Sequence, residues 1–476
     1  MNDHGPTRRA LLGGAVATIG GLAVGCSGEA TAAPPTPVFD ASDFGAAPTA
    51  TAAQNTRAFA AASAALNRAG GGTLLVPPGT YSVGARASGP RRPGRPPDII
   101  LIEGCTRPVS VIGRDVRLRA APGLRFGTFH PRTGRRFDPP RLPFTDLAYR
   151  EDAYIMVMVR ACRAPVTVQG FELDGNLGGL ELGGEWNDTG RQTTAVGVLL
   201  ESNTGGVTVR DVHSHHHGLD GLMVMHAGLT ARSPRHPVRL ENVTCDHNAR
   251  QGLSWVGGTE LTAVGCRFNR TGRARFSSAP GAGVDVEPEA SVCRNGRFVD
   301  CEFVDNAGVG LLVMTEGSEN FRFERCRFVG TTNWSAWPRA PGVVFDDCEF
   351  VGGVVNVFGH ANPTRATRFQ GCRFTGDRRR SPTGQVHGGY LIEFGGGNTN
   401  VLLDRCRLHA VDPGIALAWT VPDMRFSDCT MAQAGRAQSY PRGIYSGTNS
   451  IRSAGPVGLD GSRFLDPVTL NGRRVG

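Results

Sequence analysis

Lysine is absent from this 476-residue chain, so its 51 strongly basic residues are all arginine. This absence excludes every mechanism that needs a lysine amine, such as Schiff-base chemistry. Helical 3.6-residue periodicity is missing after about residue 70, which argues against leucine-rich, ankyrin-type and other helical repeats. No Cys-x-x-Cys pair occurs, and the histidines do not share the spacing of the cysteines, so we expect no zinc site built on cysteine.

Long apolar segments are also scarce, and only the first 33 residues contain one. Arg8 and Arg9 precede an apolar, glycine-rich stretch, which predicts a twin-arginine export signal. Residues 22–26 resemble a lipoprotein box, so we expect acylation of Cys26 and a lipid anchor at the outer face of the cell membrane. Cleavage after Ala32 or Ala33 would instead give a freely secreted protein. No other segment approaches the ~20 apolar residues that cross a bilayer.

The formal net charge of +9 persists without residues 1–33, because Arg8 and Arg9 balance Asp3 and Glu29. A basic surface favours an anionic partner, either an acidic polysaccharide or nucleic acid. No basic stripe is interleaved with aromatic residues, so we expect no nucleic acid partner. The alternative is that the charge reflects only an arginine-rich proteome.

Cysteine, in contrast, recurs through the second half of the chain in similar phrases such as FVDCEFVDN and FERCRFVG. A period in the twenties that stretches without losing phase predicts a solenoid of stacked coils with variable loops. We expect a buried, mainly reduced ladder, because free cysteine is usually buried and twin-arginine export carries proteins already folded in a reducing cytoplasm. The eight cysteines are Cys245, Cys266, Cys301, Cys326, Cys348, Cys372, Cys406 and Cys429.

Apolar and polar residues alternate within each phrase, as in a strand whose alternate side chains point inward. A second alternating run follows at residues 221–225, 252–256, 283–287 and 310–314. Because equivalent residues in successive coils should stack about one strand spacing, ~4.8 Å, apart, the runs align with one another. The two patterns predict an all-β chain that forms a single right-handed parallel β-helix solenoid.

The N-terminal part predicts a cap for this solenoid. Residues 55–68 have the composition of a helix, which glycines 70–72 end before a strand and a Pro-Pro-Gly turn. The series from Asp-Phe-Gly-Ala through this alanine-rich helix to Gly-Gly-Gly-Thr-Leu and Val-Pro-Pro-Gly-Thr-Tyr closely resembles the N-terminal cap of the pectin-lyase-like superfamily, which includes polygalacturonases and phage tailspikes. The resemblance extends in looser form to about residue 435. We expect an export signal (1–33), an N-terminal cap with a capping helix (34–84), coils with loop excursions (85–435) and a C-terminal cap or tail (436–476).

The aligned runs also define candidate catalytic residues. When Leu222, Leu253, Val284 and Leu311 point inward, two outward rows follow, namely Met223, Ser254, Asp285 and Leu312, and then Met225, Val256, Glu287 and Met314. Asp285 and Glu287 would lie ~6.6 Å apart along the backbone, on an exposed face among apolar side chains. This setting raises the pKa of at least one carboxyl, as a general acid requires.

A carboxylate pair at this spacing suits glycoside hydrolysis, in which one acid protonates the leaving oxygen and the other activates water or attacks carbon. Separations of ~6.5 to 9.5 Å favour inversion. Glu289 is a third acidic candidate and is expected to bind substrate. The alternatives are that these acids neutralise Arg273 or Arg275, or that they bind calcium, which is the one cofactor left open.

The turns before these strands supply further polar side chains. The repeats place His216 over His247, and we expect both along one edge of the acid pair together with Asp220 and Arg250. Asp220 and His247 are candidates for catalysis, whereas His216 and Arg250 are candidates for binding a charged sugar.

Two further positions are singled out by their surroundings. Trp186 lies in a polar loop at residues 174–194, where its ring could stack on a sugar. Asn248 and Asn306, aligned with His217, look like the start of a structural asparagine ladder. We assign no residue as a metal ligand.

The expected function is that of an exported carbohydrate-active enzyme that cleaves glycosidic bonds of an extracellular polysaccharide, acidic or neutral, with hydrolysis favoured over elimination. The Gly-His-Gly and Arg-x-Lys motifs of polygalacturonases are missing, so the site residues depend on strand phase alone. Two alternatives stay open. One is a lyase or epimerase acting on a uronate polymer, with His247 or Arg250 as base, and the other is a non-catalytic surface protein that binds glycan.

Overall fold

The computed structural model describes residues 36–86, 98–140, 150–152 and 154–476. The predicted export signal and Cys26 lie outside these residues, so export and lipidation stay predictions. Residues 36–476 form one unit by their internal contacts. Among the described helices, none is long and apolar enough to cross a membrane.

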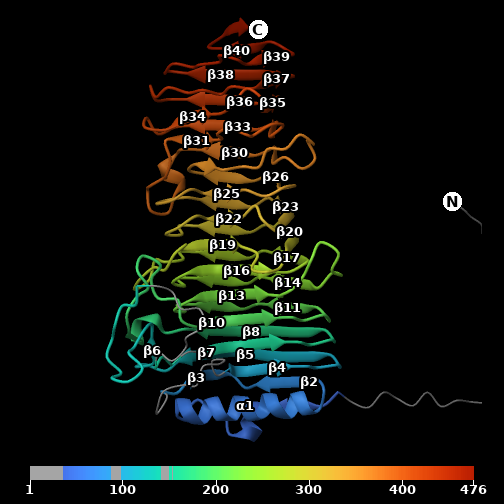
Figure 1. Ribbon diagram of the computed structural model, residues 1–476, viewed down its shortest axis with the longest axis vertical. Helices are drawn as coiled ribbons and strands as arrows, with labels where there is room; N and C mark the ends of the chain where they lie inside the picture. Colours follow the sequence, from blue (N-terminus) through green and yellow to red (C-terminus); the bar gives the residue numbers. More distant parts are fainter. Residues whose placement is uncertain (1–35, 87–97, 141–149, 153) are drawn as a thin grey trace, which may run out of the picture. The chain divides into compact units, whose positions relative to one another are not determined.

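Helix α1 (Ala52–Arg68) covers one end of the stack of strands (Figure 1). Thr51 and Gln54 form a capping box, in which each side chain accepts a hydrogen bond from the other residue's backbone amide. The helix predicted at residues 55–68 is therefore confirmed and begins slightly earlier. Its buried face, which includes Phe59 and Leu66, joins the main hydrophobic core.

A typical coil contributes one strand to a sheet of 11 strands and two strands to a sheet of 28 strands. In one such coil, β10 (Ala195–Glu201) belongs to the smaller sheet, and β11 (Val207–Arg210) and β12 (His213–His215) belong to the larger. The chain returns as β13 (Asp220–Met225), which pairs in parallel with β10. Figure 1 shows this arrangement repeated along the stack, and the parallel pairing confirms the predicted parallel β-helix.

The remaining strands of the 11-stranded sheet are β4 (Asp98–Glu103), β7 (Tyr154–Arg160), β16 (Gln251–Gly257), β19 (Ala282–Val286), β22 (Leu311–Val313), β25 (Ala336–Pro338), β28 (Val354–Val355), β31 (Tyr390–Glu393) and β34 (Ala416–Trp419). The larger sheet also contains β1 (Val38–Asp40), β2 (Gly72–Val76), β3 (Gly79–Val83), β5 (Val109–Ala120), β8 (Val166–Asp174), β14 (Pro237–Glu241), β15 (Thr244–Asp246), β17 (Glu260–Val264), β18 (Arg267–Asn269), β20 (Cys293–Val299), β21 (Glu302–Val304), β23 (Ser318–Glu324), β24 (Arg327–Val329), β26 (Val344–Asp346), β27 (Glu349–Val351), β29 (Arg368–Gln370), β30 (Arg373–Thr375), β32 (Leu402–Asp404), β33 (Arg407–Ala410), β35 (Arg425–Ser427), β36 (Thr430–Gln433), β37 (Ile444–Ser446), β38 (Asn449–Ser453), β39 (Arg463–Phe464), β40 (Val468–Leu470) and β41 (Arg473–Val475). A separate pair, β6 (Arg125–Phe126) and β9 (Glu181–Leu182), and the short 3-10 helices Ala41–Phe44, Leu177–Gly179 and Arg378–Arg380 complete the described elements.

The cysteine ladder is present, with one correction. The registers of successive strands align Cys266, Cys301, Cys326, Cys348, Cys372, Cys406 and Cys429. Cys245 was predicted to belong to this row, but it lies in β15 opposite Phe268, and Val243 takes the ladder position. The backbone explains the difference, because the left-handed residue that precedes each ladder position is Asn242 in this coil and Gly265 in the next. All described cysteines are free and buried, as expected.

Two columns of phenylalanine stack alongside this ladder. Phe298, Phe323, Phe345 and Phe369 follow one another with ring centroids 4.9 to 5.0 Å apart. The second column is Phe303, Phe328, Phe350 and Phe374, with separations of 4.5 to 4.9 Å. These distances match the spacing of neighbouring strands, so the core repeats with the coils.

Parallel pairing continues beyond residue 435, where we expected a cap or tail. Strands β36, β38 and β40 pair in parallel, and only the last strand, β41, runs antiparallel to its neighbour β40. The coils therefore extend close to the end of the chain.

Candidate functional site

The outward face of the 11-stranded sheet carries the predicted acids. Its inward residues Leu222, Leu253, Val284 and Leu311 are buried, and the strand registers align Met223, Ser254, Asp285 and Leu312, as predicted for the first outward row. The second row is partly wrong. The register shifts between Val224 and Met225, so that Met225 lies opposite Gly257 rather than Val256.

Asp285 in β19 is buried, with 1% of its surface exposed. Its short side chain lies in the row between Ser254 and Leu312, and Gln251 Nε2 donates a hydrogen bond of 2.5 Å to its Oδ2. Its other oxygen, Oδ1, is buried and has no hydrogen-bond partner within the described part of the chain. The prediction of two exposed acids is therefore wrong for Asp285, whereas Glu287 is exposed.

The surroundings of Asp285 change its protonation. Burial, followed by the negative charge of Glu287, raises the pKa of Asp285 to about 7. The guanidinium of Arg250 opposes this rise, and the carboxylates of Asp220 and Glu289 add to it. This rise favours the protonated carboxyl of Asp285 near neutral pH, which is the state that a proton donor needs.

Asp220 and Arg250 form a buried ion pair beside this acid. Arg250 Nε and Nη2 donate to Asp220 Oδ1 and Oδ2 at 2.8 and 2.5 Å. The side chain of Asp220 is fully buried, and that of Arg250 is 16% exposed. Burial raises the pKa of Asp220 and the positive charge of Arg250 opposes the rise. The charge of Arg250 also acts on Asp285 and Glu289, and the charge of Glu287 acts on Asp285. We call these five residues, Asp220, Arg250, Asp285, Glu287 and Glu289, the acid cluster.

Arg273 and Arg275, the alternative partners of these acids, bind other groups. Arg273 pairs with Asp305 at 3.0 Å, and Arg275 donates to the backbone carbonyls of Gly178 and Leu180. Glu287 and Glu289 are both exposed at the end of β19.

Trp186 does not have the predicted exposure. Only 3% of its surface is accessible, because the loop folds back on itself through a bridge between Trp186 and Gly190. The neighbouring Gly184 bridges to Thr128, so this loop packs against another segment. A sugar cannot stack on the ring of Trp186 in this structure.

The predicted histidines belong to a different group from the acid cluster. The rings of His216 and His247 stack in parallel with centroids 5.0 Å apart, which confirms their alignment. His247 Nδ1 lies 3.1 Å from Asp246 Oδ2, and His216 Nδ1 lies 2.7 Å from His215 Nδ1. Among the described residues, no hydrogen bond or ion pair joins these histidines to Asp285 or Arg250.

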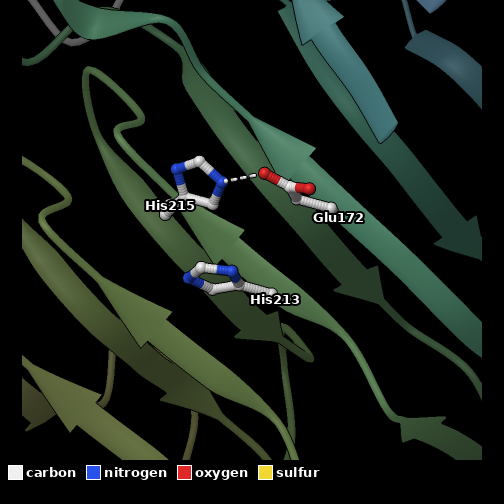
Figure 2. Close-up of side chains that lie close together, drawn as sticks. All are labelled: Glu172, His213 and His215. Atoms are coloured by element: carbon white, nitrogen blue, oxygen red, sulfur yellow. Dashed lines mark hydrogen bonds and ion pairs between the residues drawn. The ribbon is translucent and has the colours of Figure 1, made fainter. Parts of the chain in front are cut away.

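Carboxylates and imidazoles alternate across three neighbouring strands of the larger sheet. His213 of β12 lies opposite Glu172 of β8, and His215 lies between Asp174 of β8 and Asp246 of β15. Figure 2 shows the rings of His213 and His215 lying one above the other, with His215 directed at Glu172. We call these five residues, with His216 and His247, the histidine cluster.

An open groove adjoins the histidine cluster. Its cavity volume is about 1210 Å³, and its lining includes Glu172, His213 and Asp246. Arg117, Arg210, Arg267 and Arg270 also line it. The groove therefore combines several fixed positive charges with titratable groups on the outer face of the larger sheet.

The predicted asparagine ladder is a mixed polar row. His217 and Thr271 donate their backbone amides to Asn248 Oδ1 and Asn306 Oδ1, respectively. Thr271 lies between the two asparagines, because the coil that contains β18 comes between those of β15 and β21. Both asparagines are buried and structural, as expected.

Sequence reasoning missed Glu172, Asp174, His213, His215 and Asp246 as one group. The His-Ser-His alternation is a sequence signal that His213 and His215 share one face of a strand. Their carboxylate partners lie about 40 and 30 residues away in the chain, so only the register between coils reveals them.

Comparison with known proteins agrees with this architecture. A family model described as right handed beta helix region matches residues 187–328. Similar solved structures include the A-module of a mannuronan C-5 epimerase from Azotobacter vinelandii, with 16% identity, a TM-score of 0.41 and coverage of 90% of this chain and 99% of that chain. A tailspike of Acinetobacter baumannii bacteriophage Fri1, a capsular polysaccharide depolymerase, has 11% identity, a TM-score of 0.41 and coverage of 91% and 64%. An exopolygalacturonase from Thermotoga maritima has 14% identity, a TM-score of 0.30 and coverage of 93% of both chains.

No curated protein matches the chain significantly. The family model and the observed topology show a right-handed parallel β-helix, which is the fold that the resemblance to the pectin-lyase-like superfamily implies.

Proposed function

We propose that this protein is a carbohydrate-active enzyme that hydrolyses glycosidic bonds of a polysaccharide at the acid cluster. The observation that carries the proposal is the pairing of a buried Asp285 in β19, with a pKa raised to about 7, and an exposed Glu287 two residues later, directly after the end of that strand. Two carboxyl groups in such different environments suit an acid and a base.

The hydrogen bond from Gln251 supports Asp285 as the proton donor. Gln251 Nε2 donates to Asp285 Oδ2, so Oδ2 is an acceptor and the proton of the neutral acid belongs on Oδ1. Oδ1 has no hydrogen-bond partner among the described residues, so its proton would pass to a glycosidic oxygen once the side chains that bury Asp285 move aside for the substrate. Glu287, which is exposed and lies toward solvent, would then activate water as the base.

Arg250 and Asp220 would act as positioning residues in this scheme. Their ion pair holds a positive charge near Asp285, and that charge lowers the cost of forming the Asp285 carboxylate after proton transfer. Glu289 would contact the substrate at the open end of the strand.

A second candidate is elimination or epimerisation on a uronate polymer, and the groove beside the histidine cluster favours it. Its arginines would attract carboxylates of the substrate, and His213 there is hydrogen-bonded to Asp246 at 2.9 Å. In this case the acid cluster would be dispensable, and His213 rather than the predicted His247 or Arg250 would be the first candidate for the base.

One assay separates these functions. The full chain is incubated with neutral and acidic polysaccharides, with and without calcium, and reducing ends are measured together with ultraviolet absorbance. Hydrolysis predicts reducing ends without absorbance, and elimination predicts both signals. Unchanged chain length with altered sugar stereochemistry would indicate epimerisation, and binding without any turnover would indicate a glycan-binding protein.

Variants then connect activity to the acid cluster. Asp285→Asn and Glu287→Gln should each abolish hydrolysis without unfolding the protein. Glu393→Gln, on β31 of the same sheet, is a matched control that should keep full activity. Full activity in both Asp285→Asn and Glu287→Gln would refute the proposal.

A further inference from the structure

The histidine cluster combines ligand types that bind transition metals. Glu172, His213 and His215 each offer one possible ligand atom, and all three atoms lie within 4.8 Å of one another. His215 Nε2 and Glu172 Oε1 are 3.1 Å apart, and the two imidazole rings have centroids 4.3 Å apart. When two donor atoms each bind one zinc ion at ~2.0 to 2.1 Å, the distance between them is close to that between His215 Nε2 and Glu172 Oε1.

The sequence produces this convergence through strand geometry. In β12, Ser214 points inward and donates to the carbonyl of Gly221, so His213 and His215 both point outward. Glu172 lies directly opposite His213 on the neighbouring strand β8. The three side chains in Figure 2 therefore come from two hydrogen-bonded strands, which fixes their spacing without help from a loop.

Neighbouring groups orient two of the three side chains, His213 and Glu172. Asp246 Oδ1 lies 2.9 Å from His213 Nε2, so that nitrogen carries the proton and Nδ1 has a free lone pair. A carboxylate bound to the far nitrogen of a metal-binding imidazole is a common feature of metal sites. Arg117 Nε lies 3.3 Å from Glu172 Oε1 and holds that carboxylate on the side of the groove.

We propose that Glu172, His213 and His215 form a binding site for one divalent transition-metal ion, such as zinc. Two imidazole nitrogens and one carboxylate oxygen favour zinc and its neighbours in the first transition row over calcium and magnesium, which prefer oxygen ligands. The site is separate from the acid cluster, and the proposal does not depend on the hydrolytic function.

The position of this site indicates what the ion would meet. The side chain of His215 is 8% exposed, whereas those of Glu172 and His213 are 38% and 46% exposed and line the groove. Three protein ligands leave at least one coordination position for water or another ligand. The open position would face the groove, where a carboxylate or another anionic group of a bound molecule could occupy it.

Zinc binding to the full chain, produced without a histidine tag and stripped with a chelator, tests the proposal. Isothermal titration should show one saturable zinc ion per chain. Cobalt should give visible absorption bands without a thiolate charge-transfer band, which excludes the cysteines as ligands. His213→Ala and Glu172→Gln should each weaken binding at least tenfold, and Asp246→Asn should weaken it about 10- to 100-fold by releasing His213.

His409→Ala is the matched control, because His409 is an exposed outward residue of β33 in the same sheet. It should leave the affinity for zinc unchanged. Circular dichroism of each variant checks that the fold is intact, and the two half-exposed ligands His213 and Glu172 are the sites least needed for folding. Absence of saturable zinc binding, or equal affinity in the wild type and in both ligand variants, would overturn the proposal.

Discussion

Arg250 forms a bidentate ion pair with Asp220 of the preceding coil, and the same guanidinium lowers the pKa of Asp285 in the following coil. One side chain thus connects two buried carboxyl groups on β13 and β19, the strands on either side of β16. The sheet holds the strands that carry Asp220 and Asp285 in register with β16, which begins directly after Arg250. The protonation of Asp285 therefore depends on Arg250.

Replacing Arg250 should change both stability and pH dependence. Arg250→Gln leaves Asp220 buried without its partner, which should cost about 3 to 5 kcal/mol of stability. It also removes the charge that opposes protonation of Asp285, so the pKa of that carboxyl should rise above about 7. If Asp285 is the general acid, the alkaline limb of the pH–activity profile should move to higher pH.

Two variants control for this experiment. The double variant Asp220→Asn with Arg250→Gln should recover much of the lost stability, because no charge is then left unpaired. Arg273→Gln, which removes an ion pair with Asp305 rather than with the acid cluster, should leave the pH profile unchanged. An unchanged alkaline limb in Arg250→Gln would separate Arg250 from the proton donor.

Asp285→Asn should stabilise the protein at alkaline pH while it abolishes hydrolysis. The folded pKa of about 7 exceeds the unfolded value of ~3.9, so the folded state binds the proton more tightly and loses stability as pH rises between these values. Above pH 7 the loss amounts to about 4 kcal/mol, and asparagine avoids it because it carries no charge. The melting temperatures of the two proteins should be similar near pH 4 and should diverge toward pH 8. A constant difference at all pH values would show that Asp285 is not titrating there.

The fold was predictable from the sequence because its signals are local and repeated. Alternation within each phrase defines strands, and the repeated cysteine gives the coil period. The error at Cys245 shows the limit of this reasoning. Alignment by residue identity placed Cys245 in the ladder, whereas the backbone aligns on the left-handed residues Asn242 and Gly265, which neither alternation nor spacing distinguishes.

The candidate site was less predictable, because burial and distant pairing decide it. Strand phase aligned Asp285 with Ser254 correctly, but the side chain of Gln251, which bonds Asp285, was not part of the pattern. The histidine cluster requires Glu172, which is 43 residues from His215 in the chain. Such a contact depends on the length of each intervening loop, which the repeat leaves free to vary.

His217 should make the protein sensitive to acid. Burial lowers the pKa of His217 to about 3, below the usual value of 6.5, so the folded state keeps this ring neutral while the unfolded chain takes up a proton. Stability from this group is therefore complete above pH 6.5 and is lost as pH falls toward 3. The equivalent residue in the next coil is Asn248. His217→Asn should therefore be tolerated, and it should reduce the dependence of the melting temperature on pH in this range.

The control for His217 is His409→Asn, at an exposed position of β33. This change should leave the acid sensitivity as it is in the wild type. If His217→Asn and the wild type lose stability in parallel between pH 6.5 and 3, then protonation of His217 does not contribute to acid unfolding.

The thiols of the cysteine ladder should be unreactive until the protein unfolds. Burial raises the pKa of thiols such as Cys326, and buried thiols that stay protonated react slowly. Each ladder thiol also contacts backbone carbonyls, as Cys348 Sγ does with the carbonyls of Phe323 and Asp346 at 3.4 Å. In a Cys26→Ser variant of the full chain, a thiol reagent should therefore modify no cysteine under native conditions, and all eleven of the others after unfolding in guanidinium without reductant. Rapid reaction in the native state would contradict the burial, and fewer than eleven reactive thiols after unfolding would reveal disulfides between neighbouring coils.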